Sequence, residues 1–246
     1  TKQIITFTFP HIGIVGINSE DQESKKIYAD ACIINQPNNY YSNWRAERDI
    51  ETYFIENNIP CLYGIDTRYL TKKLAEDGAI KCALIHFGDN NETIEVLKKE
   101  VKNWSGLENL DLAKVVSTNE KYNWNKGTWS KNNIQKTNGS YNVTCLDFGI
   151  KENILRNLKD FNLRPTVLNL SSNYDDIIET KPDGIFLSNG PGDPFATGDK
   201  IINTLRKLID SEIPIFGICL GHQILSLALG AKTKKMFQGH RGSNHP

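Results

Sequence analysis

The stretch that decides the fold reads Pro214-Ile215-Phe216-Gly217-Ile218-Cys219-Leu220-Gly221-His222-Gln223. An apolar run typical of a buried strand ends at Cys219, and the residues that follow have the apolar spacing of a helix. Glycine stands two positions before and two positions after Cys219. This spacing is the thiol counterpart of the sharp strand-to-helix turn that exposes the nucleophile of many hydrolases. It predicts a strand that passes directly into a helix, with the sulfur of Cys219 at the turn.

The chain before this stretch repeats the same alternation of strand and helix patterns. The predicted strands cover residues 143–148, 165–170, 184–188 and 213–218, and the predicted helices cover 151–161, 174–180, 198–210 and 220–229. Strand–helix units of this length predict an α/β fold, a doubly wound parallel sheet covered on both faces. Reactive groups in such sheets gather beyond the carboxyl ends of the strands.

The first half of the chain is less regular and predicts a mixed α/β (α+β) domain over residues 1–122. The predicted strands are 4–9, 12–17, 29–35, 59–65 and 80–87, and the predicted helices are 47–58, 67–77 and 92–104. Asp66 is expected to cap the start of the second helix, and Gly78 to end it. Residues 123–141, rich in Asn, Lys, Gly, Ser and Thr, predict an exposed linker to the doubly wound domain over 142–246.

Composition excludes several classes of protein. The 246 residues carry 29 basic and 29 acidic side chains, so the chain lacks the basic surplus of a non-specific nucleic-acid binder. The apolar run at 224–231 is far shorter than the ~20 residues of a membrane span. Five cysteines without CxxC spacing fit neither a zinc ribbon nor a disulfide framework, and reduced thiols indicate the cytoplasm. The chain starts inside a strand pattern, without Met or leader, and ends abruptly, so we expect a fragment of a longer protein.

A second motif, Ser188-Asn189-Gly190-Pro191-Gly192-Asp193-Pro194, follows the strand before the cysteine turn. Both loops are expected at the same edge of the sheet, where Gly190 and Gly192 would let the backbone approach a ligand closely. The N–H groups of Leu220 and of a glycine in this loop would then stabilise an oxyanion, and the helix N-terminus favours a thiolate. Gln223 lies one helical turn beyond Cys219. The plainer alternatives are a core cysteine in a tight turn and an ordinary Gly/Pro turn.

These two motifs resemble those of the class I (triad) glutamine amidotransferases. Further stretches resemble the small (glutaminase) subunits of carbamoyl phosphate synthetase within that family: Phe9-Pro10-His11-Ile12-Gly13, Gly64-Ile65-Asp66-Thr67-Arg68, Asp147-Phe148-Gly149-Ile150-Lys151 and Gly239-His240-Arg241-Gly242-Ser243-Asn244-His245-Pro246. The resemblance spans essentially the whole chain. It implies a flavodoxin-like amidotransferase domain, incomplete at its C-terminal end.

The resemblance also implies a reaction. Cys219 would attack the side-chain amide of L-glutamine and form a thioester, which water hydrolyses to glutamate. Gly190 and Leu220 match the oxyanion-hole positions of the family, and Gly192 and Gln223 match positions that bind glutamine. No metal or cofactor is expected in this chain. Ammonia would pass to a large subunit in a heterodimer or higher oligomer, where ATP and Mg²⁺ support carbamoyl phosphate synthesis for the pyrimidine and arginine pathways.

One part of the family pattern is missing from this sequence. The family's general base is a His followed two residues later by a Glu, and His245 has no such Glu after it. His222 lies three residues after Cys219 but does not match the family's base. His11 and His86 are interpreted as structural or exposed, and His240 is expected in a turn. The chain as given is therefore expected to be poorly active.

Alternative functions and one further motif remain open. A non-catalytic module that docks on and activates a synthetase is the main alternative, and a peptidase of similar architecture is another. Asp66-Thr67-Arg68 is interpreted as a helix cap and a surface charge in a domain that docks on the large subunit.

Overall fold

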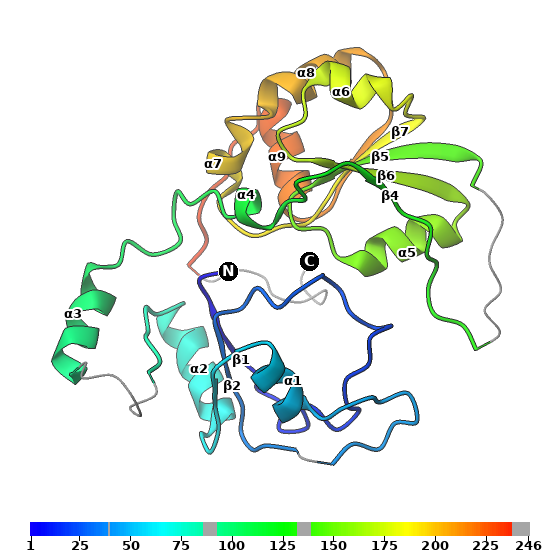
Figure 1. Cartoon of the computed structure of the whole chain (residues 1–246). Coiled ribbons are helices and arrows are strands. Elements are labelled where there is room, and N and C mark those ends of the chain that lie inside the picture. Colours follow the sequence, from blue (N-terminus) through cyan, green and yellow to red (C-terminus); the bar gives the residue numbers. More distant parts are fainter. Residues whose placement is uncertain (39, 86–92, 132–138, 238–246) are drawn as a thin grey trace. The chain divides into compact units, whose positions relative to one another are not determined.

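The computed structural model describes residues 1–38, 40–85, 93–131 and 139–237. Its internal contacts divide the chain into two compact units (Figure 1). The first unit consists of Thr1–Ser19, Lys26–Gly106 and the chain from Lys234. The second unit consists of Leu107–Thr233 together with the short segment Glu20–Lys25.

The sheet of the second unit has the strand order β4-β6-β5-β7-β8. Its strands are β4 (Tyr122–Asn123), β5 (Tyr141–Asp147), β6 (Leu163–Asn169), β7 (Gly184–Leu187) and β8 (Ile215–Gly217). Neighbours from β6 to β8 pair in parallel, and β4 joins the edge of β6 antiparallel. This order, with the first long strand between the second and the third, is that of flavodoxin-like sheets. The predicted α/β fold is confirmed.

Side chains that alternate along the strands build a core on each face of this sheet. On one face Cys145 and Phe186 pack with Leu155 of α5 (Glu152–Asp160). On the other face Leu146 and Leu187 pack with residues of three further helices, which lie together on that side of the sheet (Figure 1). Those helices are α6 (Tyr174–Glu179), α8 (Ile202–Asp210) and α9 (Leu220–Ala228). The sheet is therefore covered on both sides, which leaves the ends of its strands to form a site.

From α5 onward, the helices of the second unit follow the sequence pattern, with one difference. The helix predicted over 198–210 begins only at Ile202. A separate short helix, α7 (Pro194–Gly198), precedes it. The Asp193 carboxylate caps α7 by accepting a 2.9 Å hydrogen bond from the Phe195 N–H, and Pro194 occupies the first turn, where its missing N–H costs nothing.

The first unit contains a small parallel sheet of β1 (Ile4–Thr6), β2 (Ala31–Ile33) and β3 (Cys61–Leu62). Its helices are α1 (Ile50–Glu56), α2 (Thr67–Asp77) and α3 (Ile94–Asn103). Cys32, Ile50 and Phe54 form its core. The predicted ends of α2 are confirmed, because Asp66 Oδ1 accepts a 2.9 Å hydrogen bond from the Tyr69 N–H and Gly78 has a φ of 82°.

Two predicted strands of the first unit are wrong. Residues 12–15 form turns and Ile17 makes only an isolated bridge to Arg48. The reason is that Gly13 and Gly16 have φ values of 88° and 68°, which an extended strand does not contain. A Cβ atom on Gly13 would lie 2.7 Å from Ile50 Cγ2, so the turn packs tightly on α1. Residues 80–85 of the strand predicted over 80–87 are also not extended into a sheet, and the rest of that prediction lies outside the described residues.

The predicted boundary after residue 122 differs from the division of the chain, since the second unit already begins at Leu107. The reason is burial of apolar side chains, because Ala113 of α4 (Ala113–Val116) is part of the core beneath α8 and α9. The Ser117 hydroxyl also accepts a 3.1 Å hydrogen bond from the Leu170 N–H. The predicted linker 123–141 begins in β4 and ends in β5, and its residues 132–138 lie outside the described part of the chain.

Among the helices of the described residues, none has both the length and the apolar composition that crossing a bilayer would require.

The close packing of α9 on β7 gives a test of the fold. A Cβ atom on Gly221 would lie 2.2 Å from the carbonyl oxygen of Leu187, a backbone atom that cannot move aside. We predict that Gly221→Ala lowers the free energy of unfolding by about 2 kcal/mol, although alanine is normally the better helix former. Urea unfolding followed by circular dichroism measures this. The control is Gly184→Ala, whose Cβ would make an ordinary 3.7 Å contact, and equal stability of the two variants would contradict the packing.

Candidate functional site

Cys219 occupies the turn between β8 and α9, where the sequence places it. It is the N-cap residue of α9, with φ 54° and ψ −110°, and it is exposed. A positive φ is rare for a residue with a side chain, and such strain is typical of functional turns. The sulfur is therefore accessible at the carboxyl edge of the parallel sheet. Its role as a nucleophile stays a prediction.

Glycines on both sides of Cys219 allow the turn to be this tight. A Cβ atom on Gly217 would lie 2.7 Å from the backbone carbon of Gly221. The Gly221 N–H donates a 3.0 Å hydrogen bond to the carbonyl of Ser188. Since Leu187 and Gly217 are also paired residues of adjacent strands, the cysteine turn and the 188–194 loop leave the sheet side by side.

The 188–194 loop is fixed by polar contacts at its start. The buried Ser188 hydroxyl accepts a 2.9 Å hydrogen bond from the Phe148 N–H and donates a 2.8 Å hydrogen bond to the Asn189 carbonyl. Asn189 Oδ1 accepts a 3.2 Å hydrogen bond from the Lys151 N–H, and Asn189 Nδ2 donates one of 3.1 Å to the Gly149 carbonyl. The loop is thus tied to the chain that follows β5.

Positions 190 and 192 each require glycine, because the backbone of another segment approaches them closely. A Cβ atom on Gly190 would lie 2.0 Å from the carbonyl oxygen of Phe148. Gly192 has a φ of 106°, and a Cβ atom there would lie 2.9 Å from both the Leu110 oxygen and the Leu112 nitrogen. The two glycines predicted to contact a ligand therefore also have structural roles, and any side chain at either position would displace the loop.

Two backbone donors of this region have no hydrogen-bond partner among the residues that the structure describes. Within the described part of the chain, neither the N–H of Leu220 nor that of Gly190 takes part in a hydrogen bond. Leu220 is the first residue of α9, where the helix leaves its N–H groups unpaired. Gln223 is exposed, and its N–H donates a 3.0 Å hydrogen bond to the Cys219 carbonyl. Unpaired donors at a helix start suit a developing negative charge on a ligand.

Asp147 is a structural residue of the site to which the sequence analysis gave no role. Its carboxylate is nearly buried, with 5% exposed. Oδ1 accepts hydrogen bonds of 2.8 Å from the Gly149 and Ile150 N–H groups, and Oδ2 accepts one of 2.7 Å from the Thr118 N–H. Burial, with the nearby Asp147 charge as a smaller cause, raises the pKa of the Tyr122 hydroxyl. An aspartate at the end of a strand, two residues before glycine, is the signal that indicates this turn.

No general base is placed beside Cys219 in the described part of the chain. His222 is exposed on α9, and no imidazole there is hydrogen-bonded to the cysteine. The ring of His11 packs edge-on against Phe9 in the first unit. His86, His240, His245 and the whole predicted motif 239–246 lie outside the described residues. The described residues also contain no group of three His, Cys, Asp or Glu side chains suited to a metal ion.

Burial separates the cysteines by reactivity and predicts the pH dependence of alkylation. Burial raises the pKa of Cys32 to about 11, and it also raises the thiol pKa values of Cys61, Cys82 and Cys145. A thiol with a raised pKa has less thiolate at neutral pH and gains it as the pH rises. We predict that iodoacetamide modifies the exposed Cys219 first at pH near 7, and that the rate at Cys82 is still rising at pH 9.0, because its raised pKa delays formation of the thiolate. Peptide mass spectrometry measures this, and faster modification of Cys82 at neutral pH would contradict it.

Both halves of the chain match models of known protein families. A family model described as carbamoyl-phosphate synthase small chain, CPSase domain, matches residues 1–84, and one described as glutamine amidotransferase class-I matches residues 144–246. The chain is 45% identical to the carbamoyl phosphate synthase small chain of Zymomonas mobilis over 253 residues, which cover all of this chain and 66% of the relative.

Other small chains give the same result. Those of Rhizobium meliloti and Bartonella quintana are 45% and 46% identical, over 99% and 100% of this chain and 63% of each relative. The chain therefore spans just under two thirds of the length of these relatives. The likeness covers both units, including the cysteine turn and the loop that precedes α7, and the chain belongs to the family of carbamoyl phosphate synthase small chains.

Proposed function

We propose that this chain is the glutamine-hydrolysing part of a carbamoyl phosphate synthase. The observation that carries the proposal is the exposed Cys219 in a strained turn, directly before the N–H of Leu220, which has no partner among the described residues. The family supports the choice of glutamine over a peptide substrate. In the proposed reaction, the described residues supply the nucleophile and the oxyanion hole.

In the first step the Cys219 sulfur attacks the side-chain amide carbon of L-glutamine. A sulfur–carbon bond forms, and the carbonyl oxygen becomes an oxyanion. The carbon–nitrogen bond then breaks, and the nitrogen leaves as ammonia after it takes up a proton. Water attacks the resulting γ-glutamyl thioester, and the products are glutamate and the free thiol. Gly192 and Gln223 are proposed to bind the amino-acid part of glutamine.

The N–H groups of Leu220 and Gly190 are proposed to stabilise both oxyanions. One comparable donor contributes about 2.7–4 kcal/mol to the transition state in related hydrolytic sites. Both groups are backbone atoms held by packing, so they do not need to reorganise as the charge develops. The contact of Gly190 with Phe148 and the hydrogen bond from Gly221 to Ser188 support this preorganisation.

The proton transfers need a base that the described residues do not place at the sulfur. We propose that a histidine outside the described residues supplies it, since an activated cysteine is normally paired with one. Ammonia is proposed to pass to a large chain of the synthase, on which ATP and Mg²⁺ act to form carbamoyl phosphate. Such a complex would work in the cytoplasm and supply pyrimidine and arginine biosynthesis.

A non-catalytic role in docking and activating the large chain is the second candidate. It is favoured by the absence, within the described residues, of an imidazole hydrogen-bonded to Cys219. The two candidates differ in what removal of the sulfur does. A docking module would work equally well with serine at position 219, whereas a glutaminase would not.

The first test replaces the nucleophile in the full-length protein bound to its large chain. We predict that Cys219→Ser lowers ammonia release from glutamine by at least about 1,000-fold, because a hydroxyl is a much poorer nucleophile without strong activation. Synthesis from added ammonia should remain. Cys82→Ser, which also replaces an exposed thiol, is the control. Unchanged ammonia release by the Cys219 variant would contradict its role as the nucleophile, and a lack of ammonia release by the unaltered complex would leave only the docking role.

The second test moves one oxyanion donor. Gly190→Ala places a Cβ atom against the Phe148 carbonyl, so the loop must shift and carry its N–H with it. We predict that kcat for glutamine hydrolysis falls about 100-fold while KM changes much less, because the donor acts mainly in the transition state. Steady-state assays of ammonia release measure both constants. Gly184→Ala serves as the control, and a loss confined to KM would argue against an oxyanion role.

A further inference from the structure

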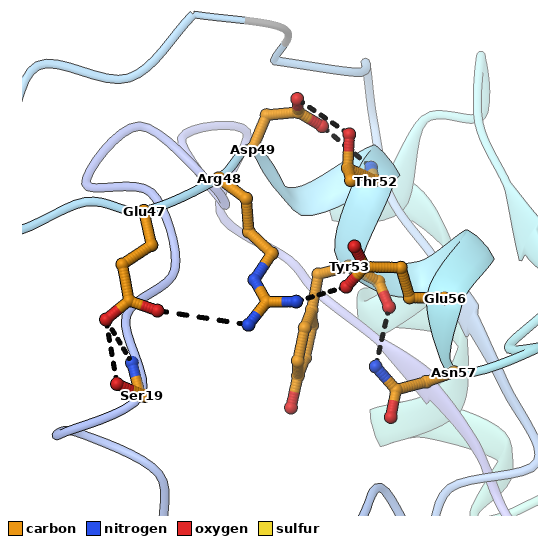
Figure 2. Close-up of polar contacts among 8 residues, drawn as sticks. All are labelled: Ser19, Glu47, Arg48, Asp49, Thr52, Tyr53, Glu56 and Asn57. Carbon is orange, nitrogen blue, oxygen red and sulfur yellow. Dashed lines mark hydrogen bonds and ion pairs between the residues drawn. The ribbon is translucent and has the colours of Figure 1, made fainter.

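Residues Glu20–Lys25, here called the strap, belong to the second unit although the residues on either side belong to the first. Ser19, just before the strap, is held within the first unit. Its N–H and hydroxyl donate hydrogen bonds of 3.1 Å and 2.7 Å to Glu47 Oε1, as Figure 2 shows. Glu47 in turn lies 3.9 Å from the Arg48 guanidinium, which also pairs with Glu56 (Figure 2). The residue that precedes the strap is therefore held within the first unit.

Glu23 of the strap binds the N-terminus of α5. The Glu152 N–H donates a 3.0 Å hydrogen bond to the Glu23 carbonyl, and the Asn153 N–H donates one of 3.0 Å to Glu23 Oε2. The residue at the N-cap position, Lys151, provides no side-chain cap. Glu23 thus takes the place of a local cap, and its negative charge suits the start of a helix.

The strap is anchored to α5 and to β4 by two further contacts. Arg156 is buried, with 8% of its surface exposed. Its guanidinium donates a 2.7 Å hydrogen bond to the Gln22 carbonyl and a 3.0 Å one to Glu152 Oε2. The Lys25 ammonium lies 5.2 Å from the centre of the Tyr122 ring. A buried cation with two acceptors is costly to leave unpaired, so this geometry resists loosening.

The capped end of α5 is directly connected to the proposed oxyanion hole. Lys151, immediately before α5, donates its N–H to Asn189 Oδ1 at 3.2 Å, and Asn189 Nδ2 donates to the Gly149 carbonyl at 3.1 Å. Gly190 follows Asn189 in the chain. A path of hydrogen bonds therefore leads from Glu23, through the first residues of α5, to the loop that carries the proposed donor.

We propose that Glu23 is a positioning residue for the oxyanion-hole loop, an inference that rests on the proposed glutaminase function. Glu23 does not touch the substrate. It holds the N-terminus of α5 in the one place from which Lys151 can orient Asn189 and hence the N–H of Gly190. A substitution far from the reacting atoms can shift a catalytic group slightly. Even a small shift of that group can lower kcat substantially.

The test uses Glu23→Ala, Glu23→Gln and a control in the full-length protein bound to its large chain. Glu23→Ala removes the acceptor, and we expect kcat for glutamine hydrolysis to fall about tenfold with KM within about twofold. Glu23→Gln keeps an oxygen that accepts from the Asn153 N–H and should restore most of the rate. Glu179→Ala, which removes an exposed carboxylate from α6, should leave kcat unchanged. A kcat loss no larger than the unfolded fraction of the alanine variant would overturn the proposal.

A double-mutant cycle with Asn189→Ala separates positioning from a loss of stability. If Glu23 acts through Asn189, the loss of kcat in the double variant is smaller than the product of the two single losses. If the two single losses of kcat simply multiply in the double variant, Glu23 does not act through Asn189 and the proposal is overturned.

Hydrogen exchange gives a readout that does not need catalysis. Glu23→Ala should speed amide exchange in peptides covering residues 148–153 and 188–192, and Glu179→Ala should not. Unchanged exchange in these peptides would overturn the proposal. If the unaltered complex releases no ammonia, the proposed function fails, and the exchange result still decides whether Glu23 orders the loop.

Discussion

The site depends on how closely the start of α9 approaches the end of β7. The hydrogen bond from the Gly221 N–H to the Ser188 carbonyl, 3.0 Å long, joins two turns that each carry part of the proposed machinery. A Cβ atom at Gly221 would fall 2.2 Å from a backbone oxygen, so this approach requires glycine. It also forces Cys219 into a positive φ and turns its sulfur outward. Strain at one residue is thus maintained by packing over the whole strand–helix junction.

Around this junction, segments far apart in the sequence contribute polar contacts rather than apolar ones. Asp147 orders the turn after β5 and also holds Thr118, and Asn189 connects that turn to the 188–194 loop. The strap reaches the same region through Glu23, which binds the N-terminal end of α5. These contacts satisfy several of the backbone N–H groups that support the loops. Within the described part of the chain, the N–H groups of Leu220 and Gly190 take part in no hydrogen bond, which fits a role toward a ligand.

Much of the second unit could be predicted from sequence, because its strands are apolar runs separated by helices of regular spacing. The cysteine turn could also be predicted, since glycines two positions before and after a cysteine at a strand end indicate a sharp strand-to-helix turn. The first unit was harder to predict. The apolar residues 12–17 look like a strand, but two glycines with positive φ turn that segment back on α1. The roles of Asp147 and Glu23 depend on partners 29 and 130 residues away, a separation that no local pattern reveals.

The central claim is that Cys219 becomes acylated by glutamine. The most direct measurement is mass spectrometry of the full-length complex, quenched in acid during turnover of glutamine and digested under conditions that preserve thioesters. The account predicts one γ-glutamyl group on the peptide that contains Cys219, and on no other cysteine peptide. Turnover of glutamine with no acyl group at Cys219, or with the group on another cysteine, would contradict it.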